Sequence, residues 1–206
     1  MTTLPDTKPL TESYELRKLT KDEILSIYTT HSVRHFPENE RKPAASIEKM
    51  YDEGIYIGYG LYSKEASDHL LCYGFFTALP EHKNILLDYF AVLEEYRSLG
   101  IGSRFLSQMK AEATKYNGFL IESEDPDYAG DEEECFIRQK RLSFYEKNNA
   151  TFTGIRADVF DVHYRLLYFP ILKRPDVQVL YSDFCDIYKY MVSEKNYRTR
   201  IHIFLP

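Results

Sequence analysis

The sequence predicts a mixed α/β (α+β) fold, in which helices flank a largely antiparallel central sheet and a helix-strand extension follows at the C-terminus. Two strand-like segments rich in Ile, Tyr, Phe and Leu, 55–62 and 70–79, flank a polar loop, as in an antiparallel hairpin. The stretch 85–116 then combines a buried strand, a glycine-containing turn and an amphipathic helix. Strands and helices continue to follow one another up to residue 204, which indicates one mixed sheet.

The first elements are marked by helix boundary signals. Residues 14–19 alternate between apolar and polar side chains and predict a strand. Thr20 with Glu23 three residues later resembles a capping box, so a helix begins there and ends near Pro37. A second helix, 44–51, is followed by Gly54, which suits a left-handed C-cap.

The later elements complete one domain. After the helix that ends at 116, we expect strands and helices at 119–123, 131–147, 151–155, 162–169, 180–192 and 200–204. No internal repeat or long linker divides the chain. We therefore expect a flexible segment 1–13 and a single domain 14–206, with a core of 14–169 and an extension of 170–206.

Composition argues against several classes of protein. The net charge of -6 disfavours a nucleic-acid binder that relies on a positive surface. The cysteines Cys72, Cys135 and Cys185 are far apart and have no metal-ligand spacing, so we expect no disulfide framework and no metal site. No apolar run approaches the roughly 20 residues of a membrane span, and the first residues contain no apolar signal core. These features predict a cytoplasmic protein without a membrane partner.

The turn after the strand 85–92 carries most of the functional information. Gly100 and Gly102 open the following helix, where unpaired backbone N–H groups and the helix dipole favour a phosphate group. The helix is anchored by an apolar stripe of Ile101, Phe105, Met109, Ala113 and Tyr116. The glycines could also serve a tight turn alone.

A Rossmann dinucleotide site is an alternative explanation of this turn, with Glu122 as the ribose contact. Two features oppose it: Phe105 stands where the third glycine would be, and a hairpin-rich region precedes the turn. A Walker loop is excluded, because no Gly-Lys-Ser/Thr is present.

The pattern Arg97-x-x-Gly100-x-Gly102, preceded by LLDYFAV and followed by an amphipathic helix, resembles the acetyl-coenzyme A motif of the GNAT superfamily of N-acetyltransferases. The resemblance implies that acetyl-CoA is the co-substrate. It implies donor-binding residues at Phe90, Val92, Arg97, Ser98, Leu99, Gly100, Ile101, Gly102 and Ser103.

A second stretch, Phe144 to Ala150, resembles the part of the family in which a tyrosine precedes a turn and a final hairpin. The family usually has glycine and an aromatic residue where this chain has Asn149 and Ala150. Asn tolerates the left-handed turn, whereas Ala150 removes a core ring. The resemblance implies that Tyr145 lies near the sulfur of coenzyme A and protonates the departing thiolate.

Acetyl transfer to an amine also requires a base and a stabilised oxyanion. Backbone groups of the strand 90–92 are candidates for the oxyanion donor. Asp88 is expected on one strand face with Phe90 and Val92, and Glu122 with Glu124 on a face of the next strand, where the two strands part. Glu122 ranks first because an unpaired carboxylate in mid-strand is costly. A structural role for either carboxylate and a proton path through water stay open.

The acidic run from Glu122 to Glu134 has two interpretations. Asp131 can cap the next helix and Glu134 can close a capping box, or the run can form a negative lip that attracts a cationic amine. Arg138, Lys140 and Arg141 follow on that helix, where they could reach coenzyme A phosphates or simply face solvent.

The predicted activity is transfer of an acetyl group from acetyl-CoA to a primary amine of a small molecule or peptide, most readily a cationic one, by a monomer or homodimer. A noncatalytic acyl-CoA sensor on the same fold is the alternative, ahead of a Rossmann-type nucleotide binder. The apolar helical stripe of the extension covers the core, a neighbouring subunit or the acceptor pocket: Tyr181, Phe184, Cys185, Tyr188, Met191 and Val192.

Overall fold

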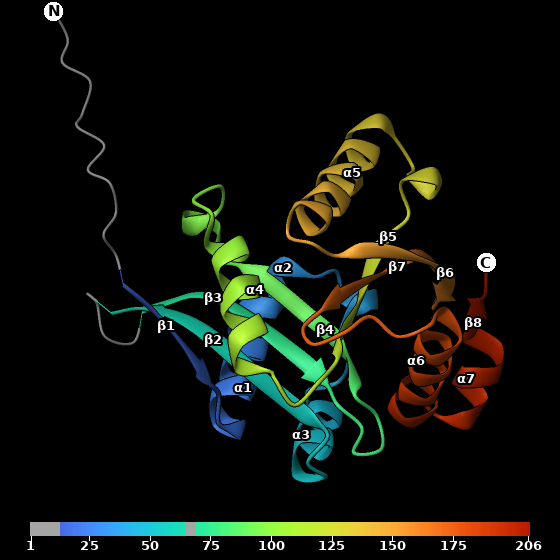
Figure 1. Ribbon diagram of the computed structural model, residues 1–206, viewed down its shortest axis with the longest axis horizontal. Coiled ribbons are helices and arrows are strands. Elements are labelled where there is room, and N and C mark those ends of the chain that lie inside the picture. The colour runs from blue at the N-terminus through green and yellow to red at the C-terminus, as the bar shows by residue number, and fades with distance from the viewer. Residues whose placement is uncertain (1–12, 65–68) are drawn as a thin grey trace, which may run out of the picture.

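The computed structural model describes residues 13–64 and 69–206. The expected flexible segment lies outside the described residues apart from Ser13, and so do residues 65–68 of the expected hairpin loop. Figure 1 shows a twisted sheet with helices on both faces. The fold is therefore the mixed, mostly antiparallel α/β architecture that the sequence predicts.

The described strands form one sheet in the order β1-β2-β3-β4-β5-β7-β6-β8. Their bounds are β1 (Tyr14–Lys18), β2 (Tyr56–Ser63), β3 (His69–Thr77), β4 (Asn84–Val92), β5 (Gly118–Glu124), β6 (Thr151–Val159), β7 (Val162–Pro170) and β8 (Ile201–Phe204). Neighbouring strands within the described residues run antiparallel, except that β4 and β5 are parallel.

The helices are α1 (Lys21–Ile27), α2 (Val33–His35), α3 (Ala44–Asp52), α4 (Ile101–Glu112), α5 (Glu132–Lys147), α6 (Val177–Met191) and α7 (Glu194–Arg200). A π-helical turn (Tyr28–Ser32) joins α1 to α2, and short 3₁₀ turns occupy Glu38–Glu40, Glu94–Tyr96 and Pro126–Tyr128. Of the described helices, none is both long and apolar enough to span a membrane.

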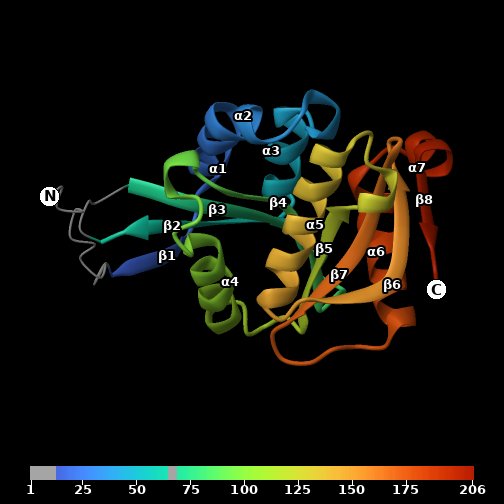
Figure 2. The ribbon, with the colours of Figure 1, turned by 90° about the horizontal axis from the view of Figure 1, so that it is seen from above.

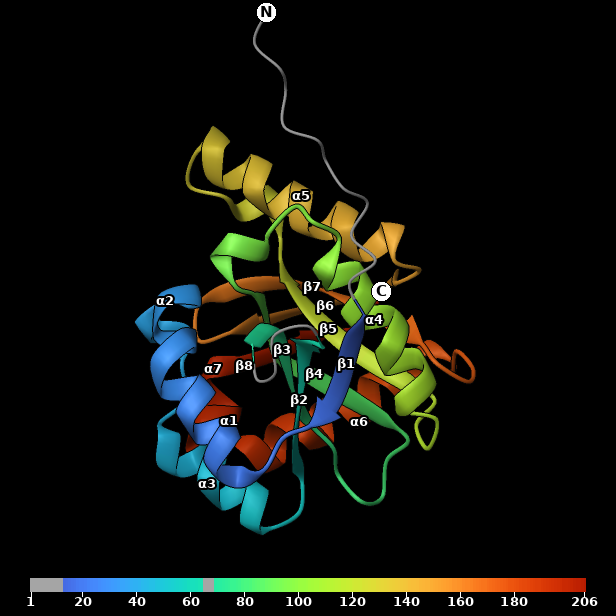
Figure 3. The ribbon, with the colours of Figure 1, turned by 90° about the vertical axis from the view of Figure 1, so that its left-hand side faces the viewer.

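The two faces of the sheet carry different helices. The core of one face contains apolar residues of α4 and α5, such as Phe105 and Tyr145. On the opposite face, α1 and α3 cover the first strands, and α6 covers the later ones through residues such as Phe184. Figures 2 and 3 show α4 and the α1–α3 group on opposite sides of the sheet. A ligand that contacts helices of both sets must therefore extend from one face of the sheet to the other.

Most of the predicted boundary signals act as expected. Thr20 and Glu23 form a capping box at α1, and Gly54 after α3 has a φ of 76°. Asn149, the substitute for the family's glycine, takes a φ of 71°. Asp131 caps α5 by accepting from the N–H of Glu134, but the Glu134 carboxylate accepts from Gly130 instead of closing the box.

Several boundaries of the sequence interpretation are corrected; the strand expected at 151–155, for example, extends to Val159 as β6. The central helix ends at Glu112, although Ala113 and Tyr116 remain buried beyond it. The separate helix α7 precedes β8, where only a strand was expected. Ser193 begins this helix by accepting from the N–H of Asn196, a short capping signal that apolar periodicity does not reveal.

The parallel pair β4–β5 creates the opening that matters for function. Its pairing ends at Leu87 with Ile121, so the strands part from Asp88 and Glu122 onward. The single parallel pair and the antiparallel hairpin before it are incompatible with a Rossmann fold, which needs a mostly parallel sheet. The Rossmann alternative is therefore wrong.

Candidate functional site

A cavity of about 1140 Å³ extends along the gap between β4 and β5. One end is lined by the turn before α4 and by α5, and the other by the Glu38–Glu40 turn, Lys42 and the end of α6. The separated strand segments 88–92 and 121–124 border the cavity between the two ends. We call the end at the turn before α4 the first chamber, and the end at Glu40, Lys42 and the end of α6 the second chamber.

The turn at the first end has a backbone suited to an anion. Gly100 has a φ of 79°, and a Cβ built on it would have nothing within 4 Å, so the conformation itself requires glycine here. Ser98 is also left-handed, with a φ of 64°. The first N–H groups of α4 have no acceptor inside the helix, and its dipole adds partial positive charge.

Gly102 has a different reason to be glycine. A Cβ at this position would lie 3.0 Å from Cζ of Phe144 and 3.3 Å from Cγ2 of Val92. The missing side chain therefore lets the first turn of α4 pack against α5 and β4. This close packing fixes the angle at which the helix start faces the cavity.

The part of β4 beyond Leu87 presents a free strand edge to the cavity. Residues 89–92 pair with β3 on one side but have no β5 partner on the other. Their unpaired edge can form hydrogen bonds with an extended ligand that bears amide groups. Within the protein, the carbonyl of Val92 accepts a hydrogen bond from Nε of Arg97 at 3.3 Å.

Phe90 supports this edge through its ring, which packs between α4 and α5. The ring centroids of Phe90 and Phe105 are 5.2 Å apart, and those of Phe90 and Tyr145 are 6.4 Å apart. The Phe90 ring is thus held by the two helices, while its backbone lies on the free edge of β4.

Tyr145 lines the cavity from the last turns of α5. Its side chain is buried, and burial raises the pKa of its phenol to about 12. Among the described residues, none forms a hydrogen bond with its hydroxyl. A neutral phenol with an unused donor fits the role of a proton source for a leaving group.

Glu122 lies on β5, one residue past the last β4–β5 pair, where the two strands part. Its carboxylate is half-buried, and Oε1 accepts a hydrogen bond from the Tyr188 hydroxyl at 2.6 Å. Burial raises the pKa of this carboxyl to about 7, against the opposing effects of the Tyr188 hydrogen bond and the Lys42 charge. A carboxylate with this pKa can accept a proton near neutral pH.

Asp88 also lines the cavity, but its carboxylate already has two partners, and one sequence prediction about it is wrong. Its carboxylate forms an ion pair with Lys42 and accepts from the Tyr56 hydroxyl at 2.7 Å. Tyr56 packs in the cluster under α1 and α3, whereas Phe90 and Val92 pack toward α4. A register irregularity opposite Phe75 and Phe76 turns Asp88 to the other face, so Asp88 does not share a face with Phe90 and Val92. Its two partners make it a weaker candidate for the base than Glu122.

Much of the acidic run is neutralised by arginines. Glu124 forms ion pairs with Arg138 and Arg141 of α5. Asp125 is almost fully buried and pairs with Arg156 at 3.1 Å and Arg165 at 2.8 Å. These ion pairs tie α5 to the end of β5, and Arg141 also lines the cavity.

Sequence reasoning missed two residues of the second chamber, Glu40 and Tyr164, and named a third, Tyr188, only within the apolar stripe of the extension. Burial raises the pKa of Glu40, and its carboxylate makes no ion pair or hydrogen bond with the residues that the structure describes. Tyr164 sits opposite Glu124 in the β5–β7 ladder. Glu40 carried no sequence signal within its polar loop, whereas Tyr188 was visible only as part of an apolar stripe.

The extension contributes to both the core and the cavity. Phe184 and Tyr188 pack in the cluster beneath α6, and Tyr188, Met191 and Val192 line the second chamber. The stripe therefore covers the core and also borders the cavity. Among the described residues, no group of His, Cys, Asp or Glu is arranged to hold a metal ion.

Residues 13–148 match the family model described as "Acetyltransferase (GNAT) family". A search among curated proteins found no match.

Solved structures with the same fold include two bacterial enzymes. The ribosomal-protein-S18-alanine N-acetyltransferase from Escherichia coli is 14% identical, with a TM-score of 0.54 over 79% of this chain and 97% of that one. The spermidine N-acetyltransferase from Vibrio cholerae, in complex with CoA and spermine, is 11% identical, with a TM-score of 0.56 over 78% of this chain and 96% of that one. At these identities the likeness establishes the fold alone.

Proposed function

Because the chain belongs to the acetyltransferase (GNAT) family, an acyltransferase family, we propose that it moves an acetyl group from acetyl-CoA to a primary amine by direct attack on the thioester. One observation carries this proposal: a single cavity joins the turn at the start of α4 to the half-buried Glu122 through the gap between β4 and β5. The acceptor is a cationic small molecule or peptide amine.

The donor end is built from main-chain groups and a few side chains. We assign the pyrophosphate of acetyl-CoA to the turn formed by Arg97, Ser98, Leu99, Gly100, Ile101, Gly102 and Ser103, where the N–H groups and dipole of α4 favour an anion. The open edge of β4 at Phe90 and Val92 would receive the amide-bearing arm of the donor. These groups fit the donor because the glycine turn and the free edge border the same cavity.

Tyr145 and Glu122 are the proposed acid and base. Tyr145 donates its phenolic proton to the leaving thiolate, and Glu122 removes a proton from the attacking amine. A backbone N–H on the free β4 edge is the candidate oxyanion donor, a contribution that is typically worth about 10²–10³ in rate. Asp88 acts through Lys42 and Tyr56 as a structural partner of this chamber.

Acetyl-CoA should protect the protein against thermal unfolding, and NAD should not. A ligand at 100 times its dissociation constant adds about 2.7 kcal/mol to the free energy of unfolding. Gly100→Val should remove most of the protection, because valine resists a positive φ and places its side chain at the turn. Gly54→Val is the matched control, since Gly54 has a φ of 76° and an equally open Cβ position outside the cavity. Protection that survives Gly100→Val unchanged would remove this turn from the donor site.

The acceptor should carry a second positive charge. Glu40 and Glu122 both face the second chamber, and the described residues give Glu40 no cationic partner. In an amine screen read by thiol release, diamines should outperform monoamines of equal length. Glu40→Gln should raise KM for the diamine about tenfold, the loss expected for one charged hydrogen bond. Glu132→Gln, an exposed member of the acidic run, should leave KM unchanged. Equal KM values in both variants would place the second charge elsewhere.

A further inference from the structure

The hydrogen bond between Tyr188 and Glu122 joins the extension to the proposed base. Tyr188 belongs to α6, which begins at Val177, beyond the residues 13–148 that match the family model. Its hydroxyl donates to Oε1 of Glu122 at 2.6 Å. The described residues provide no donor for the second oxygen, Oε2. One carboxylate oxygen is therefore held, and the other is available to an amine in the cavity.

The position of the Tyr188 hydroxyl is fixed by packing. The side chain is only 5% exposed, and its ring meets the ring of Phe184 edge-on at a centroid distance of 4.9 Å. A phenol held in this way loses little additional freedom when it forms its hydrogen bond. Its direction is set by α6, so the orientation of Glu122 depends on where α6 lies.

Buried polar contacts attach α6 to the sheet. Asp183, on the same helix, pairs with Nδ1 of His82 at 2.7 Å and accepts from Nδ2 of Asn84 at 2.6 Å. Asn84 is the first residue of β4, and it also accepts a hydrogen bond from Tyr168 of β7 at 2.6 Å. The helix α6, whose Tyr188 contacts Glu122, is thereby tied to β4 and β7, the two strands that flank β5 in the sheet.

We infer that Tyr188 is a positioning residue of the reaction: its hydroxyl holds the Glu122 carboxylate in the ionised form and directs Oε2 toward the acceptor amine. The inference rests on the proposed function of Glu122 as the base. The extension is then a part of the catalytic chamber and not only a cover for the core.

The charges around Glu122 set the direction of the expected effect. Burial disfavours the carboxylate, and the negative charges of Asp88 on β4 and Glu40 before α3 act in the same direction. The Tyr188 hydrogen bond and the Lys42 ammonium favour the carboxylate, while Tyr164 of β7 adds a phenol that remains neutral because burial raises its pKa. Removing the Tyr188 hydroxyl must therefore raise the pKa of Glu122.

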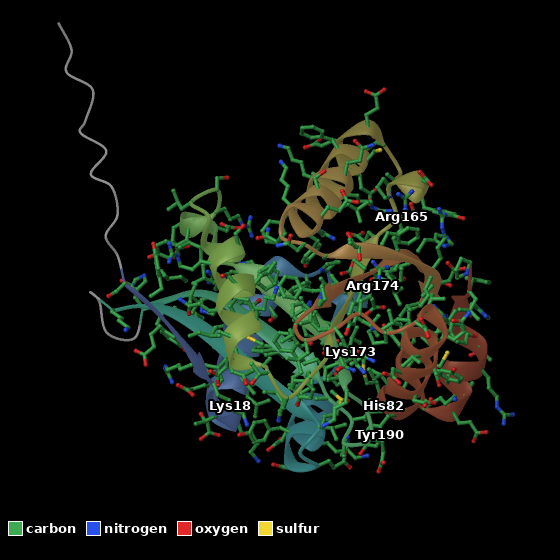
Figure 4. All side chains as sticks on the ribbon, in the orientation of Figure 1. Lys18, His82, Arg165, Lys173, Arg174 and Tyr190 are labelled. Carbon is green, nitrogen blue, oxygen red and sulfur yellow. The ribbon has the colours of Figure 1, made fainter. Side chains whose placement is uncertain are left out.

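Tyr188→Phe keeps the buried ring and removes the donor. We expect the acid limb of kcat/KM against pH to move upward by about one pH unit, the shift that corresponds to one hydrogen bond to a charged group. Activity lost at neutral pH should return at higher pH, and KM for acetyl-CoA should not change. The matched control is Tyr190→Phe. Tyr190, which is labelled in Figure 4, lies on the same helix, and its hydroxyl donates to Glu53 after α3 at 2.8 Å. It does not line the cavity.

A second readout does not depend on activity. Carbon-13 NMR of the glutamate carboxyls, with the Glu122 signal identified by its loss in Glu122→Gln, should show a higher pKa for Glu122 in Tyr188→Phe than in the unchanged protein. If no amine is acetylated but this pKa shift occurs, the Tyr188 hydroxyl still holds the Glu122 carboxylate, and it is the proposed function that fails. An unmoved pKa and an unmoved acid limb, even with a lower melting temperature, would reduce Tyr188 to a packing residue and overturn the inference.

Discussion

Glu122→Gln is expected to lower kcat/KM for the amine by about 10²–10⁴ at pH 7, the typical contribution of a general base. The amide cannot accept the proton of the amine, although its oxygen can still accept the Tyr188 hydrogen bond that Oε1 receives at 2.6 Å. In the unchanged protein, kcat/KM should rise with pH through the Glu122 pKa of about 7 and then level, because only the ionised carboxylate acts as a base. The variant should lose this dependence. Initial rates of thiol release between pH 5 and pH 9 measure both effects.

The thermal stability of Glu122→Gln shows whether its lower kcat/KM comes from the lost base or from misfolding. The carboxyl of Glu122 has a higher pKa in the folded protein, about 7, than in an unfolded chain, about 4.3. Between these two pH values the folded protein binds more protons than the unfolded chain, so its free energy of unfolding falls as the pH rises through this range. Gln at position 122 removes this cost. We therefore expect a melting temperature at pH 8 that is equal to or higher than that of the unchanged protein. Full turnover with the same pH profile in Glu122→Gln would exclude the residue as the base.

Tyr145→Phe should lower kcat by about 10²–10⁴ where chemistry limits the rate, because the leaving thiolate then lacks its proton donor. The ring remains, so its contacts with Phe90 and Phe144 should hold α5 in place. Single-turnover thiol release isolates the chemical step from product release.

Tyr59→Phe is the control for this substitution. Burial raises the pKa of Tyr59 to about 12 as it does for Tyr145, but Tyr59 does not line the cavity. It should therefore keep its turnover. If Tyr145→Phe matched Tyr59→Phe in single-turnover rate, the thiolate would be leaving without a phenol, and the acid would have to be sought elsewhere.

The strand, turn and helix of the proposed donor half were predictable from the sequence because local signals specify them. A strand, a glycine turn and an amphipathic helix follow one another without interruption, and the requirement for a positive φ at Gly100 is a local property of the chain. The capping signals of Thr20 and Asp131 are local for the same reason. The family resemblance added acetyl-CoA as the proposed donor, which no spacing specifies by itself.

The acceptor half depends on contacts between distant residues. Tyr188 reaches Glu122 across 66 positions of the chain, and no periodicity records such a pair. The face of Asp88 was mispredicted because a one-residue irregularity in β4 changes the alternation on which the prediction relied. The arginines that neutralise the acidic run, such as Arg156 and Arg165, lie on later strands, so the run looked more electronegative in the sequence than it is in the fold. The cytoplasmic setting and the monomeric or homodimeric state stay predictions.

Thiol release from acetyl-CoA, with and without a diamine, is the most direct test of the proposed reaction. We predict release that depends on the amine, saturates with it and follows the ionisation of Glu122 near pH 7. The acetylated diamine should accumulate in equal amount to the thiol. Binding of acetyl-CoA without amine-dependent release for any acceptor in the screen would contradict the proposal and favour a noncatalytic acyl-CoA sensor.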